Sequence, residues 1–151
     1  MTTMIIGERT NTLVSETVLD ELSETGARLC RWLGEKDLSR YLLDNARVEG
    51  ETRVEAWVRL NERITTSRPN RILLLGAVAR DTFFDDGDVP VRRWAELYFG
   101  ASDRPSRLFP VRLAWIWHPS PRCRKYNDKK ELDATMLFVR QVGLMARDDE
   151  R

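Results

Sequence analysis

The chain contains one histidine in 151 residues, and the position of that histidine suggests chemistry. His118 opens the tetrapeptide His-Pro-Ser-Pro and directly follows the apolar run 111–117. Such a run is typical of a β-strand, and prolines cannot continue a strand's hydrogen-bond ladder, so the chain must leave the sheet at the histidine. In open α/β sheets, ligands bind outside the carboxyl ends of the strands. We therefore expect His118 in a ligand-binding crevice, with an ordinary polar loop residue as the alternative.

Basic residues gather around this turn, although the net charge of the chain is only +1. Residues 1–50 carry six Lys or Arg and nine Asp or Glu, whereas residues 101–130 carry eight basic and two acidic residues. The eight are Arg104, Arg107, Arg112, Arg122, Arg124, Lys125, Lys129 and Lys130. Such clustering is expected of a face that binds a polyanion, and a solvated charged surface produces the same count. Arg122, Arg124 and Lys125 are the candidates for contacts with a phosphate backbone.

The composition is that of a globular protein with one domain. Hydrophobic residues make up 42% of the chain and charged residues 32%, and neither an apolar stretch of 18 residues nor a signal-peptide pattern occurs. We therefore expect an intracellular, cytoplasmic protein. The two cysteines, Cys30 and Cys123, are too few for a four-cysteine zinc or iron–sulfur site and are predicted to be free thiols. No metal and no cofactor are predicted.

Apolar periodicity predicts strands that alternate with helices. The predicted strands are 4–7, 45–48, 71–76 and 111–117, and the predicted helices are 16–33, 37–43, 51–65, 77–84, 91–98 and 127–146, the last capped by Asn127. Alternation of this kind implies parallel crossovers. The sequence therefore predicts a three-layer α/β/α sandwich with a central, mostly parallel four-stranded sheet. It forms one domain over residues 1–151, with a disordered tail at 146–151.

Three predicted strand ends, taken in order, resemble the signature segments of the uracil-DNA glycosylase superfamily. They are Ile5-Ile6-Gly7-Glu8-Arg9-Thr10-Asn11, Leu73-Leu74-Leu75-Gly76-Ala77-Val78-Ala79 and Trp117-His118-Pro119-Ser120-Pro121. Members of that family combine a Gly-Glu first motif, a Leu-Leu-Gly-x-x-Ala turn and a late His-Pro-Ser-Pro motif. The resemblance covers residues 4–145, and its most specific part is the His-Pro-Ser-Pro segment.

The chain departs from this family at the positions that recognise the base. Some relatives continue Gly-Glu as Ala-Pro-Gly and lead to an aromatic residue that stacks on uracil, whereas here Glu8 precedes the segment 9–11 and no aromatic residue occurs before Trp32. The family's uracil-reading asparagine has Asn45 as its only nearby counterpart. An arginine and a cysteine at 122–123 occupy the place of the apolar wedge that fills the gap left by a flipped base.

The resemblance implies hydrolysis of the bond between a base and its sugar in DNA. This reaction passes through a cationic sugar and a departing base anion. Glu8 would orient a water and stabilise the sugar, and His118, while neutral, would donate a hydrogen bond to the base. Ser120 and the backbone beside it would hold the phosphates around an everted nucleotide. The other predicted substrate- and DNA-binding residues are Gly7, Arg9, Asn11, Asn45, Gly76, Arg122, Arg124 and Lys125.

Simpler interpretations remain open beside these. In them Glu8 pairs with Arg9 or caps a helix, Asn11 serves a turn, and Trp115 and Trp117 pack in the core. Three functions follow: a DNA glycosylase acting on uracil or a modified base in DNA repair, a non-catalytic nucleobase-, nucleotide- or DNA-binding protein on the same fold, and an unrelated nucleotide-binding α/β protein. For the first we expect single- or double-stranded DNA as partner, no membrane contact, a monomer, and association with the nucleoid.

Overall fold

The computed structural model of the chain describes residues 1–9, 24–85, 89–101 and 103–150. Within these residues, five strands form one sheet in the order β2-β1-β3-β5-β4. Their bounds are Thr3–Arg9 (β1), Leu42–Arg47 (β2), Arg71–Leu75 (β3), Ala95–Phe99 (β4) and Phe109–Ile116 (β5). Neighbours among β2, β1, β3 and β5 pair in parallel, and β4 pairs antiparallel with β5. The mostly parallel sheet is confirmed, with five strands in place of the predicted four.

The additional strand, β4, lies where a helix was predicted over 91–98. Ala95, Leu97 and Phe99 are shielded in the sheet while Glu96 and Tyr98 are exposed, which is the two-residue period of a strand. A stretch of this length does not separate that period clearly from a helical one. The antiparallel pairing with β5 therefore decides its conformation.

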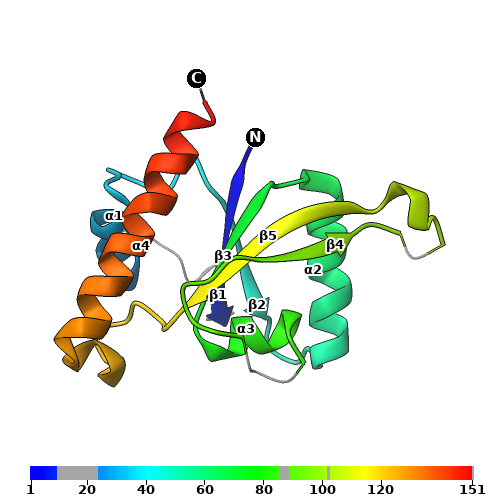
Figure 1. Ribbon diagram of the computed structural model, residues 1–151. Coiled ribbons are helices and arrows are strands. Elements are labelled where there is room, and N and C mark those ends of the chain that lie inside the picture. The colour runs from blue at the N-terminus through cyan, green and yellow to red at the C-terminus, as the bar shows by residue number, and fades with distance from the viewer. Residues whose placement is uncertain (10–23, 86–88, 102, 151) are drawn as a thin grey trace.

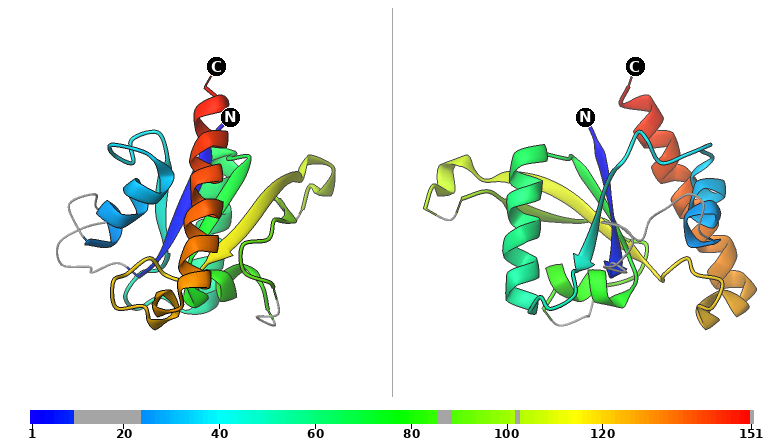
Figure 2. Two further views of the ribbon diagram at one scale, coloured as in Figure 1. Left: turned by 60° about the vertical axis from the view of Figure 1, so that its left-hand side comes forward. Right: turned by 180° about the vertical axis from the view of Figure 1, so that it is seen from behind.

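Helices cover both faces of the sheet, as Figures 1 and 2 show. α1 (Glu24–Leu33) and α4 (Lys129–Asp148) pack together on one face, and α2 (Arg53–Ser67) and α3 (Ala77–Phe83) cover the other. β1 shows why both faces are covered, because Met4, Ile5 and Ile6 are buried in succession and point to alternate faces. The predicted three-layer α/β/α sandwich is confirmed.

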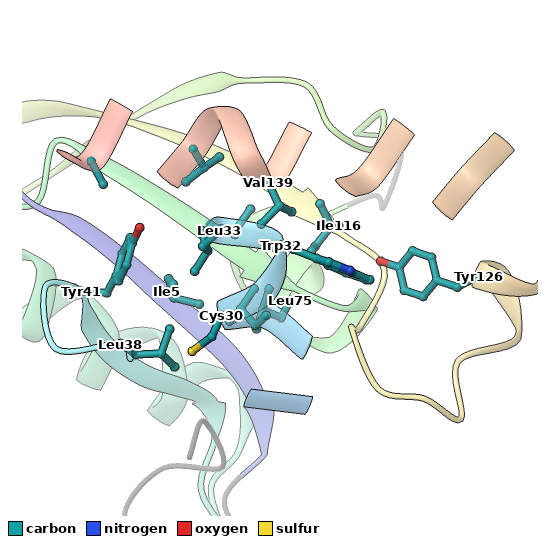
Figure 3. Close-up of a cluster of buried hydrophobic side chains, with 14 residues drawn as sticks. Ile5, Cys30, Trp32, Leu33, Leu38, Tyr41, Leu75, Ile116, Tyr126 and Val139 are labelled. Atoms are coloured by element: carbon teal, nitrogen blue, oxygen red, sulfur yellow. The ribbon is translucent and has the colours of Figure 1, made fainter. Parts of the chain in front are cut away.

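The core beneath α1 and α4 depends on a close approach of these two helices. Figure 3 shows Ile5 and Ile116 of the sheet gathered with Leu33 of α1 and Val139 of α4. A Cβ on Gly143 of α4 would lie 2.1 Å from the carbonyl oxygen of Leu33. Glycine at this point therefore lets α4 cross directly over the end of α1.

The helix predicted over 37–43 is wrong. The Asp37 carboxylate accepts hydrogen bonds from the backbone N–H of Ser39 at 3.0 Å and from its hydroxyl at 2.6 Å. A side chain that binds the backbone two residues ahead offers a turn in place of a helix. β2 then starts at Leu42, three residues before the predicted strand.

Both ends of α4 also differ from the prediction. Its N-terminal cap is Asp128 and not Asn127, because the Asp128 carboxylate accepts the N–H of Lys130 at 2.9 Å. The helix continues to Asp148, and Asp149 forms an ion pair of 2.8 Å with the buried Arg71 of β3. Since a buried guanidinium requires a partner, this pair holds the end of the chain, and the disordered tail predicted over 146–151 is wrong for residues 146–149.

The remaining predicted helices agree with the structure within a few residues at each end. The predicted helix 16–33 corresponds to α1 from Glu24 onward, and its earlier part lies outside the described residues. Across the described part of the chain, no helix is both long enough and apolar enough to cross a membrane.

Candidate functional site

The carboxyl ends of β1, β3 and β5 lie side by side at one edge of the sheet. Glu8 lies near the end of β1, Gly76 directly follows β3, and His118 comes two residues after the end of β5. The chain runs from β1 to β2 on one side and later to β3 on the other, so the strand order reverses at this point. Such a reversal forms the ligand crevice of open α/β sheets. The three segments singled out in the sequence therefore meet at one edge.

The carboxylate of Glu8 lies against the backbone of Gly76. A Cβ on residue 76 would be 2.0 Å from Glu8 Oε1, and the φ of Gly76 is 95°, in the region that favours glycine. The N–H of Val78, in the first turn of α3, donates a hydrogen bond to the same carboxylate oxygen at 3.4 Å. Glycine at position 76 is therefore what leaves room for the carboxylate beside this turn.

His118 is partly buried and lies within electrostatic range of Glu8. The N–H of Ser120 donates to His118 Nδ1 at 3.3 Å, so the neutral imidazole carries its proton on Nε2. Burial lowers the pKa of His118 below its ordinary value of 6.5, and the negative charge of Glu8 opposes this shift. Because burial is the larger effect, His118 is neutral at pH 7 and has a hydrogen-bond donor at Nε2.

The turn that carries His118 is bound by two side chains that were not expected from the sequence. The Tyr126 hydroxyl donates a hydrogen bond to the carbonyl of Trp117, and Arg28 Nη1 donates to the carbonyl of Ser120 at 3.4 Å. Arg28 has no sequence signal of its own, because an arginine in a helix is ordinarily a solvated surface residue. Tyr126 ends the basic run after the turn, and that run drew attention only through its charges.

Five of the eight basic residues of 101–130 lie near the two ends of β5, while Arg112 lies within this strand and Lys129 and Lys130 begin α4. Arg104 and Arg107 precede this strand, whereas Arg122, Arg124 and Lys125 follow it, and all five side chains are exposed. The eight residues of β5 separate the two groups by about 25 Å. Figure 1 shows the β4–β5 hairpin projecting away from the end of the sheet where β5 finishes. The basic residues of 101–130 therefore do not form one continuous face, and of these two groups only the second, which contains the predicted phosphate contacts, adjoins His118.

The other predicted site residues have different places. Gly7 of β1 and Asn45 of β2 are paired in register, and both are buried next to the Glu8 end of the sheet. Arg9 is the last residue of β1. Asn11 lies outside the described residues. The structure thus brings Gly7 and Asn45 close to Glu8. The turn of His118 follows β5, which lies two strands from β1 and three from β2.

The two tryptophans before His118 pack as predicted. The rings of Trp115 and Trp117 meet edge to face with centroids 4.8 Å apart, and Trp115 is 3% exposed. Lys125 Nζ lies 4.6 Å from the centroid of the Trp117 ring. Cys30 and Cys123 are free thiols, as predicted. Within the described ranges, no three His, Cys, Asp or Glu side chains gather as metal ligands would.

A scan against models of protein families matched none of them, and a search of curated proteins found no match. The geometry of the side chains at the strand ends is therefore the basis for assigning a function.

The contact between Glu8 and Gly76 can be tested by a double-mutant cycle. Gly76 has a φ of 95° and a ψ of 170°, a region open almost only to glycine, so Gly76→Ala adds backbone strain of about 1–3 kcal/mol. The clash with the carboxylate should cost about 1–3 kcal/mol more. Glu8→Ala removes the clashing group, so the double variant should be more stable than the sum of the single effects by about 1 kcal/mol. The measurement is the free energy of unfolding in urea.

Gly50→Ala is the matched control for this cycle. Gly50 also has a positive φ of 84°, but no atom lies within 4 Å of the Cβ that alanine would add. It should therefore show the strain alone, and Glu8→Ala should add to it without coupling. Additive losses for Gly76→Ala and Glu8→Ala, as expected for Gly50→Ala and Glu8→Ala, would show that Glu8 does not occupy the space beside residue 76.

The electrostatic contact between Glu8 and His118 predicts a signed change in pKa. Because Glu8 raises the pKa of His118, Glu8→Gln should lower it further. The single histidine gives one imidazole signal, so its NMR titration measures this pKa directly. Below pH 6.5 the unfolded chain binds more protons at His118 than the folded chain does, so the free energy of unfolding falls on acidification. Well above pH 6.5 the imidazole is neutral in both states, and His118 has no such effect. A pKa that rises in Glu8→Gln would contradict the proximity of the two groups.

Proposed function

We propose that the chain hydrolyses the N-glycosidic bond of uracil or another modified base in DNA, as the resemblance to the uracil-DNA glycosylase superfamily implies. The observation that carries this proposal is the pair of Glu8 and His118. One is a carboxylate and the other a neutral hydrogen-bond donor, and they lie at the ends of β1 and β5 on either side of Gly76. The reaction needs a negative charge beside the cationic sugar and a hydrogen-bond donor beside the departing base, and these two groups supply them.

In this mechanism the bond between the sugar carbon and the base nitrogen breaks, and its electron pair leaves with the base. The sugar becomes cationic, so a carboxylate beside it lowers the energy of the transition state. Glu8 supplies this charge and orients the water that attacks the sugar carbon. As the water attacks, it gives a proton to the Glu8 carboxylate. His118 Nε2–H donates to the oxygen of the departing base anion, and burial keeps the imidazole neutral for that role.

DNA is the proposed partner because the target base must leave the stack to reach this edge of the sheet. Ser120 and the backbone around it would contact the phosphates of the everted nucleotide, and Arg122, Arg124 and Lys125 would contact the phosphates beyond it. Gly7, Arg9, Asn45 and Gly76 would border the base and sugar. We propose that a monomer acts on single- or double-stranded DNA in the cytoplasm, associated with the nucleoid.

A non-catalytic module that binds a nucleobase, nucleotide or DNA on the same fold is the second candidate. It is favoured by the hydrogen bond from Val78 N–H to Glu8 and by the packing of that carboxylate on Gly76, because a carboxylate held in this way can serve the turn alone. It is also favoured by Trp117, because its ring packs against Lys125 and Trp115 and these contacts have a structural role without any base.

The decisive assay is the formation of abasic sites in oligonucleotides that carry uracil or other modified bases, single-stranded and mismatched. We expect Glu8→Gln to lower the rate by at least about 100-fold while DNA binding persists, because the variant keeps the shape of the side chain and loses its charge. His118→Gln should lower it comparably. The wild-type rate should stay level on acidification through pH 6.5 and fall only near the lower pKa of His118. Wild-type protein that binds DNA and never produces an abasic site across the panel would favour the binding module.

The basic residues on the two ends of β5 predict different salt dependences. Replacing Arg122 and Arg124 with alanine should reduce the slope of log affinity against log salt by about 1 for each phosphate that the protein no longer neutralises. Arg104 and Arg107 form the matched control, because they are also exposed and carry the same charge at the far end of β5. Anisotropy titrations with a short oligonucleotide between about 50 and 200 mM salt measure both. An equal decrease of the salt slope for the two pairs of variants would mean that DNA does not bind at the His118 end in particular.

A further inference from the structure

The turn 118–121 contains two prolines, so it has few backbone donors with which to hold itself in place. Its internal hydrogen bonds run from Ser120 N–H to His118 Nδ1 and from Cys123 N–H to the Ser120 carbonyl, at 3.3 and 3.0 Å. Ser120 Oγ also accepts the N–H of Arg122 at 3.2 Å. These bonds shape the turn, but they do not attach it to the rest of the protein.

The attachment comes from Arg28 of α1 and from Tyr126, which lies in the short 3₁₀ helix Arg124–Asn127. The Tyr126 hydroxyl donates to the carbonyl of Trp117, the residue before His118. Arg28 Nη1 donates to the carbonyl of Ser120, two residues after His118. The histidine is therefore held on both sides by groups from other elements. Burial raises the pKa of Tyr126, so its hydroxyl remains a donor throughout the neutral range.

Arg28 and Tyr126 belong to one aromatic cluster. The Arg28 guanidinium carbon lies 4.8 Å from the centroid of the Trp32 ring and 5.3 Å from that of Tyr126, and the two rings meet edge to face at 5.2 Å. Figure 3 shows Trp32 and Tyr126 next to each other at the edge of the core. Trp32 and Tyr126 are 5% and 6% exposed, and a cation over shielded rings is held more strongly than one in water. Since Arg28 and Trp32 are four residues apart on α1, the helix itself brings them together.

This cluster acts on His118 through Ser120. The Ser120 N–H is the donor that keeps the proton of the imidazole on Nε2. Without Arg28, the carbonyl of Ser120 keeps only the N–H of Cys123, a partner within the same segment, and loses its bond to α1. We expect residue 120 to shift and its N–H to select the tautomer less strictly. The aromatic cluster thus connects α1 to the turn that carries His118.

We propose that Arg28 is a positioning residue for His118: held on Trp32 and Tyr126, it fixes Ser120 and through Ser120 the orientation of the imidazole. Its kinetic consequence rests on the proposed glycosylase function, whereas its effect on the imidazole does not. Arg28 acts without touching the base or the sugar.

The test compares Arg28→Met, Arg28→Lys and Tyr126→Phe with the wild-type chain. Methionine keeps an apolar side chain over the rings and removes the donor, lysine keeps the charge, and phenylalanine keeps the ring and removes the hydroxyl. The first readout is the nitrogen NMR spectrum of the single histidine, which reports its tautomer and pKa. We expect the wild type to show one tautomer, with the proton on Nε2, and Arg28→Met to show a mixture. Lysine should restore part of the wild-type spectrum, and Tyr126→Phe should change it in the same direction as methionine.

The second readout is the rate of abasic-site formation at saturating DNA. Arg28→Met should lower this rate by about 10- to 100-fold, the range expected for a misplaced catalytic group, with the affinity for DNA unchanged. Arg31→Met is the matched control, because Arg31 is exposed on the same helix and the variant removes the same charge. It should leave the rate, the affinity and the histidine spectrum as they are.

Two results would overturn the proposal. An unchanged histidine spectrum in both Arg28→Met and Tyr126→Phe would show that the cluster does not orient His118. A weaker affinity and a salt slope smaller by about 1 in Arg28→Met, with the imidazole unaffected, would make Arg28 a phosphate contact instead.

A wild-type chain that forms no abasic sites would contradict the proposed function alone. The NMR comparison would still decide the role of Arg28. If Arg28→Met does not fold, Arg28→Lys provides the comparison, because it keeps the charge and replaces the guanidinium donor; a histidine spectrum identical to that of the wild type would then contradict the role of Arg28.

Discussion

The carboxylate of Glu8 occupies the space in which any residue other than glycine at position 76 would place its Cβ. This contact sets how closely the end of β1 approaches the turn after β3. The parallel register continues on the other side of β3, where Leu75 pairs with Ile116 and the Gly76 N–H donates to the Ile116 carbonyl at 2.7 Å. Gly76 therefore lies between the two titratable groups of the candidate site. A larger residue there would displace the carboxylate and disturb the strand end that leads to His118.

The protonation state of His118 is decided by two opposing effects. Burial disfavours the imidazolium and the nearby carboxylate favours it, and burial is the stronger of the two. Had the charge of Glu8 prevailed, the two groups would form an ion pair and neutralise each other. With burial prevailing, a carboxylate and a neutral donor lie at this edge of the sheet as separate groups. This separation is what a reaction with a cationic sugar and an anionic leaving group requires.

The turn of His118 shows how rigidity and attachment can have different origins. Its prolines restrict the backbone dihedral angles locally, but they also remove donors that would bind the turn to its surroundings. Aromatic and guanidinium groups from α1 and from the segment after the turn supply that attachment. The turn of His118 is therefore attached to α1, the helix that packs with α4 on the same face of the sheet.

Glu8, Gly76 and His118 were identifiable in the sequence because each follows or ends an apolar segment of strand length. Alternating strands and helices imply a parallel sheet, and parallel strands place their carboxyl ends at one edge, so the approximate meeting of these residues followed from local pattern alone. Local pattern was insufficient where competing interactions decide the conformation. The segment Ala95–Phe99 becomes a strand through pairing with β5, and residues 37–43 form no helix because the Asp37 side chain binds Ser39.

Contacts between distant segments were decided by the tertiary structure alone. The basic residues of 101–130 are close in sequence, yet β5 carries them to opposite ends of the sheet because an extended chain spans the whole molecule. Conversely, Arg28 and Ser120 are 92 positions apart and form a hydrogen bond, and Arg71 and Asp149 are 78 apart and form an ion pair. The sequence by itself therefore determined which strand ends carry the candidate residues, since that depends on short apolar segments and their terminators. The partners that orient those groups were decided by packing, because a side chain's neighbours in space depend on how the helices and strands come together and not on its position along the chain.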